Sequence, residues 1–310
     1  MRFLFSILFC FILFPIHGYT QNAFVYEMRS AYTDLTNNIT TGFVSLSDNY
    51  QLSEHPDSLA VPDTLIQYGG RYLELTGKYR SRLLKTTSIA ETDSVYIYDY
   101  TKRNMYAFPV NRLKTVAILT PYDMARGKKY QSDYMIGFEI DPKKIKSENE
   151  YLENYFASTG PINPFSNMDL HPIIWQATDS SCFPIGQNDP KYFKLKPTDI
   201  RNNTFEYIEG DLVFYTQDII NANGSFKARH VRVINIYSQD IVFDNYYTFG
   251  EGTSLNGLNG NSFMKQWTGK LFNNQPPVLF GFTYQSFGCI QIPFITNPYS
   301  FINLFCDNRH

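Results

Sequence analysis

Cysteine and histidine side chains offer the strongest chemistry in this sequence. Three cysteines follow the apolar N-terminal segment, namely Cys182, Cys289 and Cys306. A thiol becomes a nucleophile only where a base or a positive field produces the thiolate. His171 and His230 lie inside the chain and are the candidate bases. One hypothesis is therefore a cysteine enzyme that uses Cys289 or Cys182 with one of these imidazoles.

The surroundings of Cys289 form the sharpest local pattern, Ser286-Phe287-Gly288-Cys289-Ile290-Gln291. Its Ser, Gly, Cys and Ile resemble the active-site motif of the L,D-transpeptidases, secreted cysteine enzymes that cross-link cell-wall peptides. The resemblance implies that Cys289 is the nucleophile. Phe287 stands where the motif has His or Arg, and Gln291 stands where it has Arg. The groups that would activate the thiol are missing locally, so a base must come from a distant part of the chain.

A second arrangement lies upstream, where His171, Asp179 and Cys182 are close in sequence. His171 could act as the base for Cys182, with Asp179 orienting the ring. The alternative is a loop histidine whose ring is bonded to nearby backbone groups. His230 falls within a predicted strand, where we expect it to make a structural hydrogen bond.

The odd number of cysteines allows at most one internal disulfide. An exported chain permits such a bond. Cys289 and Cys306 would close the shortest loop and hold down the C-terminal segment. The two pairings that use Cys182 remain open.

Carboxylates cluster at two places in the chain. These acids are Glu206, Glu209 and Asp211 in one cluster, and Asp240 and Asp244 in the other. Neither cluster matches the twelve-residue calcium loop, and the scattered His and Cys side chains lack the usual zinc spacings. We therefore expect no metal site and no cofactor. A carboxylate hydrolase stays open as a third hypothesis, since its two acids need only face each other across a cleft.

Asparagine and glycine dominate the segment 250–262, which lies between aromatic strands. Amide side chains beside an aromatic face can bind sugars through hydrogen bonds and stacking. The candidate ligand-binding residues are Asn256, Asn259, Asn261, Trp267 and Tyr247. The competing interpretation is a long flexible turn that needs positive φ angles.

Composition and charge restrict the class of protein. The chain has 310 residues, a formal net charge of -2 and 18% charged residues. Its apolar content of 43% is too high for a disordered chain. Without a basic surplus there is no electrostatic reason to expect nucleic-acid binding.

Residues 1–20 have the pattern of a secretory signal peptide, with Arg2 followed by a short apolar run and Pro15. The run is too short to span a bilayer, and we expect cleavage near Thr20. No later stretch is long and apolar enough for a transmembrane segment. The mature chain is therefore expected to be soluble, in the periplasm or outside the cell.

Aromatic residues make up 17% of the chain and favour strands. Alternating apolar runs predict antiparallel hairpins over 95–108 and 211–249, with Asn223-Gly224 as one turn. Further strands are expected at 115–119, 134–140, 278–284 and 290–295.

Other local patterns predict helices and one more hairpin. The spacing of apolar residues predicts a short helix over 23–35. A capping box that begins at Ser147 predicts another helix, over 147–156. Gly69-Gly70 predicts a hairpin over 64–76.

The expected fold class is mainly β (α+β). Predominantly antiparallel sheets form a sandwich- or barrel-like arrangement with one or two short helices. We expect an N-terminal β-rich half at 21–157, an irregular proline-rich connection at 158–204 and a C-terminal β-rich half at 205–310. One continuous domain over 21–310 is the alternative.

These observations favour an exported, non-catalytic, β-rich protein with a binding or structural role. Its expected partner is an envelope or extracellular component, with a glycan as the candidate ligand. The shortage of groups that titrate near neutral pH argues against catalysis. The alternative function is a secreted cysteine enzyme that acts on cell-wall peptides through Cys289.

Overall fold

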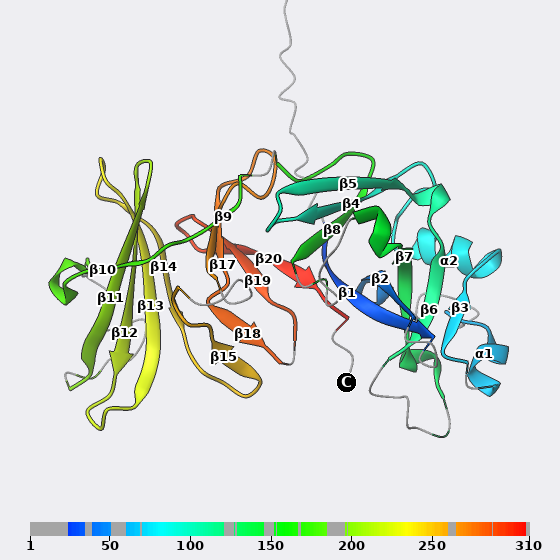
Figure 1. Cartoon of the computed structure of the whole chain (residues 1–310), viewed down its shortest axis with the longest axis horizontal. Helices are drawn as coiled ribbons and strands as arrows, with labels where there is room; N and C mark the ends of the chain where they lie inside the picture. Colours follow the sequence, from blue (N-terminus) through cyan, green and yellow to red (C-terminus); the bar gives the residue numbers. More distant parts are fainter. Residues whose placement is uncertain are drawn as a thin grey trace, which may run out of the picture.

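The protein is described by a computed structural model. It covers residues 24–34, 39–50, 60–68, 70–120, 127, 129–145, 152, 154–166, 169–184, 196, 198–259, 265–286 and 288–307. Within them the chain is mostly β, with mainly antiparallel sheets in a sandwich-like arrangement and short helices (Figure 1). This confirms the expected fold class. No helix among these residues is long and apolar enough to cross a membrane.

The N-terminal part contains strands β1 to β8 and both α-helices. The strands are β1 (Val25–Asp34), β2 (Ile39–Ser45), β3 (Tyr72–Glu74), β4 (Ser94–Asp99), β5 (Asn104–Pro109), β6 (Thr115–Leu119), β7 (Tyr134–Ile140) and β8 (Tyr155–Gly160). The helices are α1 (Asp63–Gln67), α2 (Lys78–Thr86) and the 3-10 helices η1 (Ser47–Asn49), η3 (Val110–Arg112), η5 (Gln131–Asp133) and η6 (Pro142–Ile145). β1 joins the strand series β3-β6-β7-β2 to β8, which pairs with the β4–β5 hairpin.

Strands from the C-terminal part extend the same 13-stranded sheet beyond β1. They are β20 (Ser300–Phe305), β19 (Gln291–Phe294), β17 (Val278–Phe280), β16 (Trp267–Gly269) and β9 (His171–Pro172). β20 lies parallel to β1, with Val25 opposite Leu304. The first described strand and the last therefore meet at the centre of the molecule (Figure 1).

A separate five-stranded sheet forms the other end of the molecule (Figure 1). Its strands are β10 (Gln176–Ala177), β11 (Ile200–Glu209), β12 (Leu212–Ile220), β13 (Phe226–Asn235) and β14 (Ile241–Tyr247), with the 3-10 helix η7 (Ser180–Cys182) nearby. Buried Val231 and Val233 share a core with Leu279 of β17 and with Phe282, which lies between β17 and β18. A short ribbon of β15 (Thr253–Leu255) and β18 (Thr283–Gln285) follows.

Several predicted hairpins are confirmed. β4 pairs with β5, and β12, β13 and β14 form a continuous antiparallel meander. Gly224 has a φ of 83° in the β12–β13 turn, which explains why glycine follows Asn223 there. The strands expected at 115–119 and 134–140 are β6 and β7.

The predicted helix at 23–35 is wrong, because Val25–Asp34 is strand β1. Its apolar spacing fits helical periodicity, but β2, β8 and β20 supply hydrogen-bonding partners along it. Tyr26 and Met28 belong to the hydrophobic core of the N-terminal part, here called the N-terminal core, which also contains Val44. Val25 belongs to a second core, here called the central core, which also contains Leu304. Tertiary pairing thus overrides the local pattern.

The structure also differs from four further local predictions. Tyr155 and Phe156 begin strand β8 rather than ending a helix, while Ser147 lies outside the described residues. The expected hairpin at 64–76 is replaced by α1 and by β3, which pairs with β6. The segment 250–262 contains β15, and β11 begins at Ile200 inside the connection expected to be irregular.

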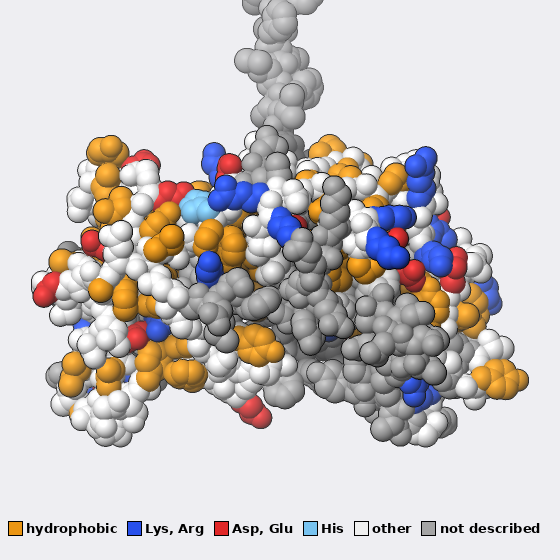
Figure 2. Space-filling view, viewed as in Figure 1, with side chains coloured by type: hydrophobic (Ala, Val, Ile, Leu, Met, Phe, Trp, Pro, Cys, Tyr) orange, Lys and Arg blue, Asp and Glu red, His pale blue; other side chains and the backbone are white. Residues whose placement is uncertain are grey.

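Surface character differs between the two ends of the molecule. On the face drawn in Figure 2, apolar side chains are prominent over the five-stranded sheet, while Lys and Arg side chains are more numerous over the centre and the N-terminal part. Exposed apolar side chains on the five-stranded sheet and its turns are Ile200, Ile208, Tyr237 and Phe249.

Candidate functional site

A cavity of about 290 Å³ lies where β1 meets the central strands and the β15–β18 ribbon. Its charged lining residues are Glu27, Arg29, Lys265 and Asp307, and its aromatic lining residues are Tyr100, Trp267, Phe280 and Tyr284. The formal charges of the two acidic and the two basic side chains cancel. The lining thus combines ring surfaces with charged groups, as expected of a site for a polar ligand.

Strand alternation on β1 presents Glu27 and Arg29 to this cavity. The intervening residue Met28 is fully buried in the N-terminal core, so its neighbours point to the opposite face. Arg29 Nη2 donates to Glu27 Oε2 over 3.1 Å. Both side chains are about a third exposed, at 38% and 33%, so the ion pair itself adds little stability.

The aromatic lining residues are not equally accessible. Trp267 and Phe280 are only 7% and 4% exposed. Tyr100 packs edge-on against both, at centroid distances of 5.0 and 5.7 Å, and is itself partly buried. Tyr284 is 58% exposed. Tyr100 also stacks on Phe156, at a centroid distance of 5.0 Å. Trp267 and Phe280 therefore support the wall, Tyr284 offers ring surface to a ligand, and Tyr100 adds only the part of its ring that these neighbours leave exposed.

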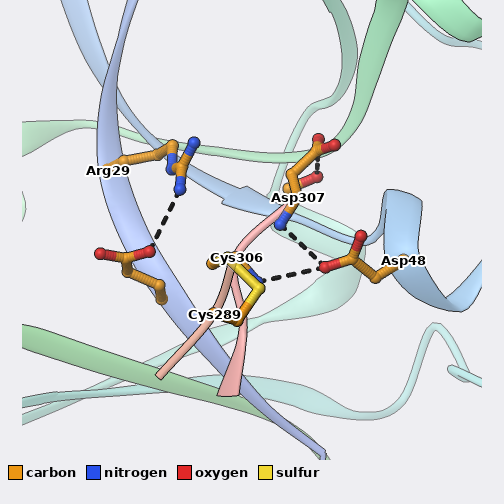
Figure 3. The surroundings of a disulfide bond; sticks show 7 residues. Arg29, Asp48, Cys289, Cys306 and Asp307 are labelled. Atoms are coloured by element: carbon orange, nitrogen blue, oxygen red, sulfur yellow. Dashed lines mark hydrogen bonds and ion pairs between the residues drawn. A yellow bond between two sulfur atoms is a disulfide. The ribbon is translucent and has the colours of Figure 1, made fainter. Parts of the chain in front are cut away.

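A disulfide and two side chains fix the wall of the cavity next to Asp307 (Figure 3). The sulfur atoms of Cys289 and Cys306 lie 1.98 Å apart. Asp48 Oδ2 accepts hydrogen bonds from the backbone N–H groups of Cys306 and Asp307, at 3.1 and 2.8 Å. Ser45 Oγ donates to Asp307 Oδ2 over 2.5 Å. The end of β20 is thereby held by the disulfide and by the β2–η1 segment.

The cysteine pairing is the one that closes the shortest loop. A sulfur in a disulfide has no thiolate, so Cys289 in this state cannot act as the nucleophile of the cysteine-enzyme hypothesis. Cys182 is an exposed free thiol at the end of η7. Asp179 Oδ1 accepts hydrogen bonds from the hydroxyl group and from the backbone N–H of Ser181, and these bonds lower the pKa of Asp179.

His171 is bonded to groups other than Cys182. Its Nε2 lies 2.9 Å from Glu209 Oε2, and its Nδ1 lies 2.9 Å from the carbonyl oxygen of Asp169. The imidazole links β9 to the end of β11. One of the carboxylates from the predicted clusters, Glu209, is thus committed to this histidine.

His230 is fully buried on β13, away from the cavity lining. Its Nε2 lies 2.5 Å from Asp244 Oδ1, and Arg232 Nη2 donates to Asp244 Oδ2 over 2.8 Å. The ring stacks on Tyr246 and lies at a tilt against Phe183, at centroid distances of 3.9 and 4.7 Å. The imidazole is therefore closed off from solvent and held by structural contacts.

The same network controls the ionisation of Asp244. Burial opposes the charged form, but the hydrogen bonds and positive charge of His230 and Arg232 outweigh it, and the pKa of Asp244 is lowered. The carboxylate holds β13 and β14 together as an ion.

The predicted ligand-binding residues reach the cavity only in part. Trp267 and Asn256 line it, although Asn256 Nδ2 donates to the carbonyl oxygen of Gly281. Asn259, at a φ of 56°, exchanges hydrogen bonds with both the N–H and the C=O of Trp175. Asn261 lies outside the described residues.

The remaining predicted ligand residue, Tyr247, is stacked on Phe282 at 4.8 Å and does not line the cavity. Burial raises the pKa of Tyr247. The sequence offered no signal for Glu27, Arg29 or Tyr284, because strands far apart in the chain bring them together. Among the described residues, no group of three or more His, Cys, Asp and Glu side chains is arranged to hold a metal ion.

No family model, curated protein or solved structure matches this chain.

Proposed function

We propose that this chain is an exported, non-catalytic protein that binds a saccharide in the central cavity. The carrying observation is the combination of partly exposed rings, Tyr100 and Tyr284, with charged groups around one cavity. Sugar rings stack their C–H faces on aromatic rings, and their hydroxyl groups exchange hydrogen bonds with charged and amide side chains.

The size and surroundings of the cavity support this role. A volume of about 290 Å³ is near the lower end of the range for ligand sites, so it suits one short saccharide. The disulfide and the Asp48 hydrogen bonds hold one wall in place before a ligand arrives. Such pre-organisation lowers the entropic cost of binding.

Export is supported by the same disulfide. Disulfides persist in oxidising compartments and are rare in the cytosol. The cavity lies beside the bond, so reduction of Cys289 and Cys306 would remove one of the restraints on its wall.

The chain offers a spectroscopic test because it has 2 tryptophans. Trp267 lines the cavity, and Trp175 is buried in the core next to the five-stranded sheet. Protein labelled with 5-fluorotryptophan should give two fluorine signals, which a Trp175→Phe variant assigns. The probes are di- and trisaccharides of neutral, amino and acidic type, at up to millimolar concentration.

We expect saturable shifts of the Trp267 signal and none of the Trp175 signal. Tyr284→Ala should abolish the shift, because it removes the most exposed ring of the lining. Tyr237→Ala is the matched control, since this residue is 82% exposed and lies outside the lining. No response of Trp267 to any saccharide in the panel would refute the proposal.

A further inference from the structure

The hydrogen-bonding groups of the cavity differ in whether they are already occupied. Among the acceptors, Glu27 Oε2 receives Arg29, Asp307 Oδ2 receives Ser45, and Gln285 Oε1 receives Thr253 at 2.8 Å. The acidic and amide side chains of the lining are therefore partly satisfied by the protein.

Lys265 differs from the other charged side chains of the lining. Lys265 has no hydrogen bond or ion pair with any residue in the described part of the chain. The guanidinium of Arg29 makes one hydrogen bond, through Nη2 to Glu27, although it carries five N–H donors. The ammonium group of Lys265 is thus free to bind a ligand, and the remaining N–H groups of Arg29, on β1, are further donors.

The position of Lys265 in the fold also suits it to bind a ligand. Lys265 precedes Trp267 by two residues, and its carbonyl oxygen lies against Gly281, where an added Cβ would be 2.3 Å away. The backbone of Lys265 is therefore closely packed against the cavity wall. This packing fixes the position from which the Lys265 side chain extends. A flexible side chain on a fixed backbone can reach a ligand without rebuilding the site.

We propose that the ligand is an acidic saccharide of the uronate class, whose carboxylate is bound by Lys265 with help from Arg29. This inference rests on the proposed saccharide-binding function and names its substrate class. The carboxylate accepts charge-assisted hydrogen bonds from the uncommitted donors. The pyranose ring carrying it lies against Tyr284 and Tyr100.

The test compares digalacturonic acid with its dimethyl ester, which keeps both rings and removes the charge. Affinities are measured from the Trp267 fluorine signal and by calorimetry. We expect the acid to bind at least about tenfold more tightly than the ester, the difference of one charge-assisted hydrogen bond. Added salt should weaken the binding of the acid and leave the binding of the ester unchanged.

Lys265→Gln should lower the affinity for the acid about tenfold and bring the two probes close to equal affinity. Lys270→Gln is the matched control, because Lys270 is exposed on the neighbouring segment and does not line the cavity. Equal binding of acid and ester by the wild type, or an unchanged ratio in Lys265→Gln, would overturn the uronate inference while leaving saccharide binding intact. Failure of every saccharide in the wider panel would overturn both.

Discussion

The bond between Cys289 and Cys306 should be a major source of stability for the centre of the molecule. It joins the segment before β19 to the residue after β20, with a sequence separation of 17. Breaking it releases a loop of that length in the unfolded chain. The loop-entropy relation gives a loss of about 3 kcal/mol at room temperature, or about 100-fold in the folding equilibrium.

The fold should survive this loss. Asp48 still holds the N–H groups of residues 306 and 307, and Ser45 still donates to Asp307. Hydrogen bonds to a charged group contribute about 1.5–3 kcal/mol each. A domain with typical stability of about 5–15 kcal/mol therefore remains folded without the disulfide, and its unfolding transition stays measurable.

The assay is urea unfolding followed by tryptophan fluorescence. The proteins compared are the oxidised wild type, the wild type with dithiothreitol, and the variant with both Cys289→Ala and Cys306→Ala. We expect both perturbations to lower the free energy of unfolding by about 3 kcal/mol. Cys182→Ala is the control, because this exposed thiol is outside the bond and its removal should leave stability unchanged.

Two results would refute this reasoning. One is a loss below about 1 kcal/mol on reduction, which would mean that the bond does not constrain the unfolded chain as assumed. The other is an effect of dithiothreitol on the Cys289→Ala and Cys306→Ala double variant as large as its effect on the wild type. The double variant lacks the bond, so such an effect could not come from reducing it.

Three further predictions concern the stability of the fold. Gly137→Ala should lower the free energy of unfolding by about 3 kcal/mol or more, since the new Cβ would lie 2.0 Å from the carbonyl oxygen of Val44. Gly127→Ala is the control in urea unfolding and should leave stability unchanged, because nothing lies within 4 Å of the added Cβ. The lowered pKa of Asp244 means that its ion pairs stabilise the fold above the ordinary carboxyl pKa and lose this effect as pH falls through the lowered value. Urea midpoints from neutral pH into the acid range should therefore fall more steeply for the wild type than for Asp244→Asn, and parallel curves would contradict the assignment. Burial raises the pKa of Tyr26 to about 12, so its neutral form stabilises the fold fully below pH about 10 and this contribution is lost as pH rises towards 12. Tyr26→Phe should flatten the alkaline decline of the urea midpoint, and an unchanged decline would contradict the burial effect.

Local signals were sufficient for the hairpins. The β4–β5 hairpin and the β12–β13–β14 meander follow from alternating apolar residues with turn residues between them. Asn223-Gly224 marks a turn because glycine tolerates the positive φ that the turn requires. In these cases the hydrogen-bonding partner is the next segment of the chain.

The same kind of reasoning failed wherever the partner was distant. The spacing around Met28 suits a helix, yet β1 is a strand because β2, β8 and β20 pair with it. Tyr155 and Phe156 enter β8 because β1 and β4 lie on either side. Periodicity in one segment carries no information about strands supplied by another.

The candidate site shows the same division. The sequence by itself indicated the strand-rich class, the expectation of export, the shortest cysteine loop and two cavity residues, Asn256 and Trp267. Only the tertiary structure brought Arg29 and Tyr284 to one cavity and placed Glu209 within hydrogen-bonding distance of His171. The physical reason is that residue type sets what a side chain can bind, whereas its actual partners depend on which distant strands the fold places beside it.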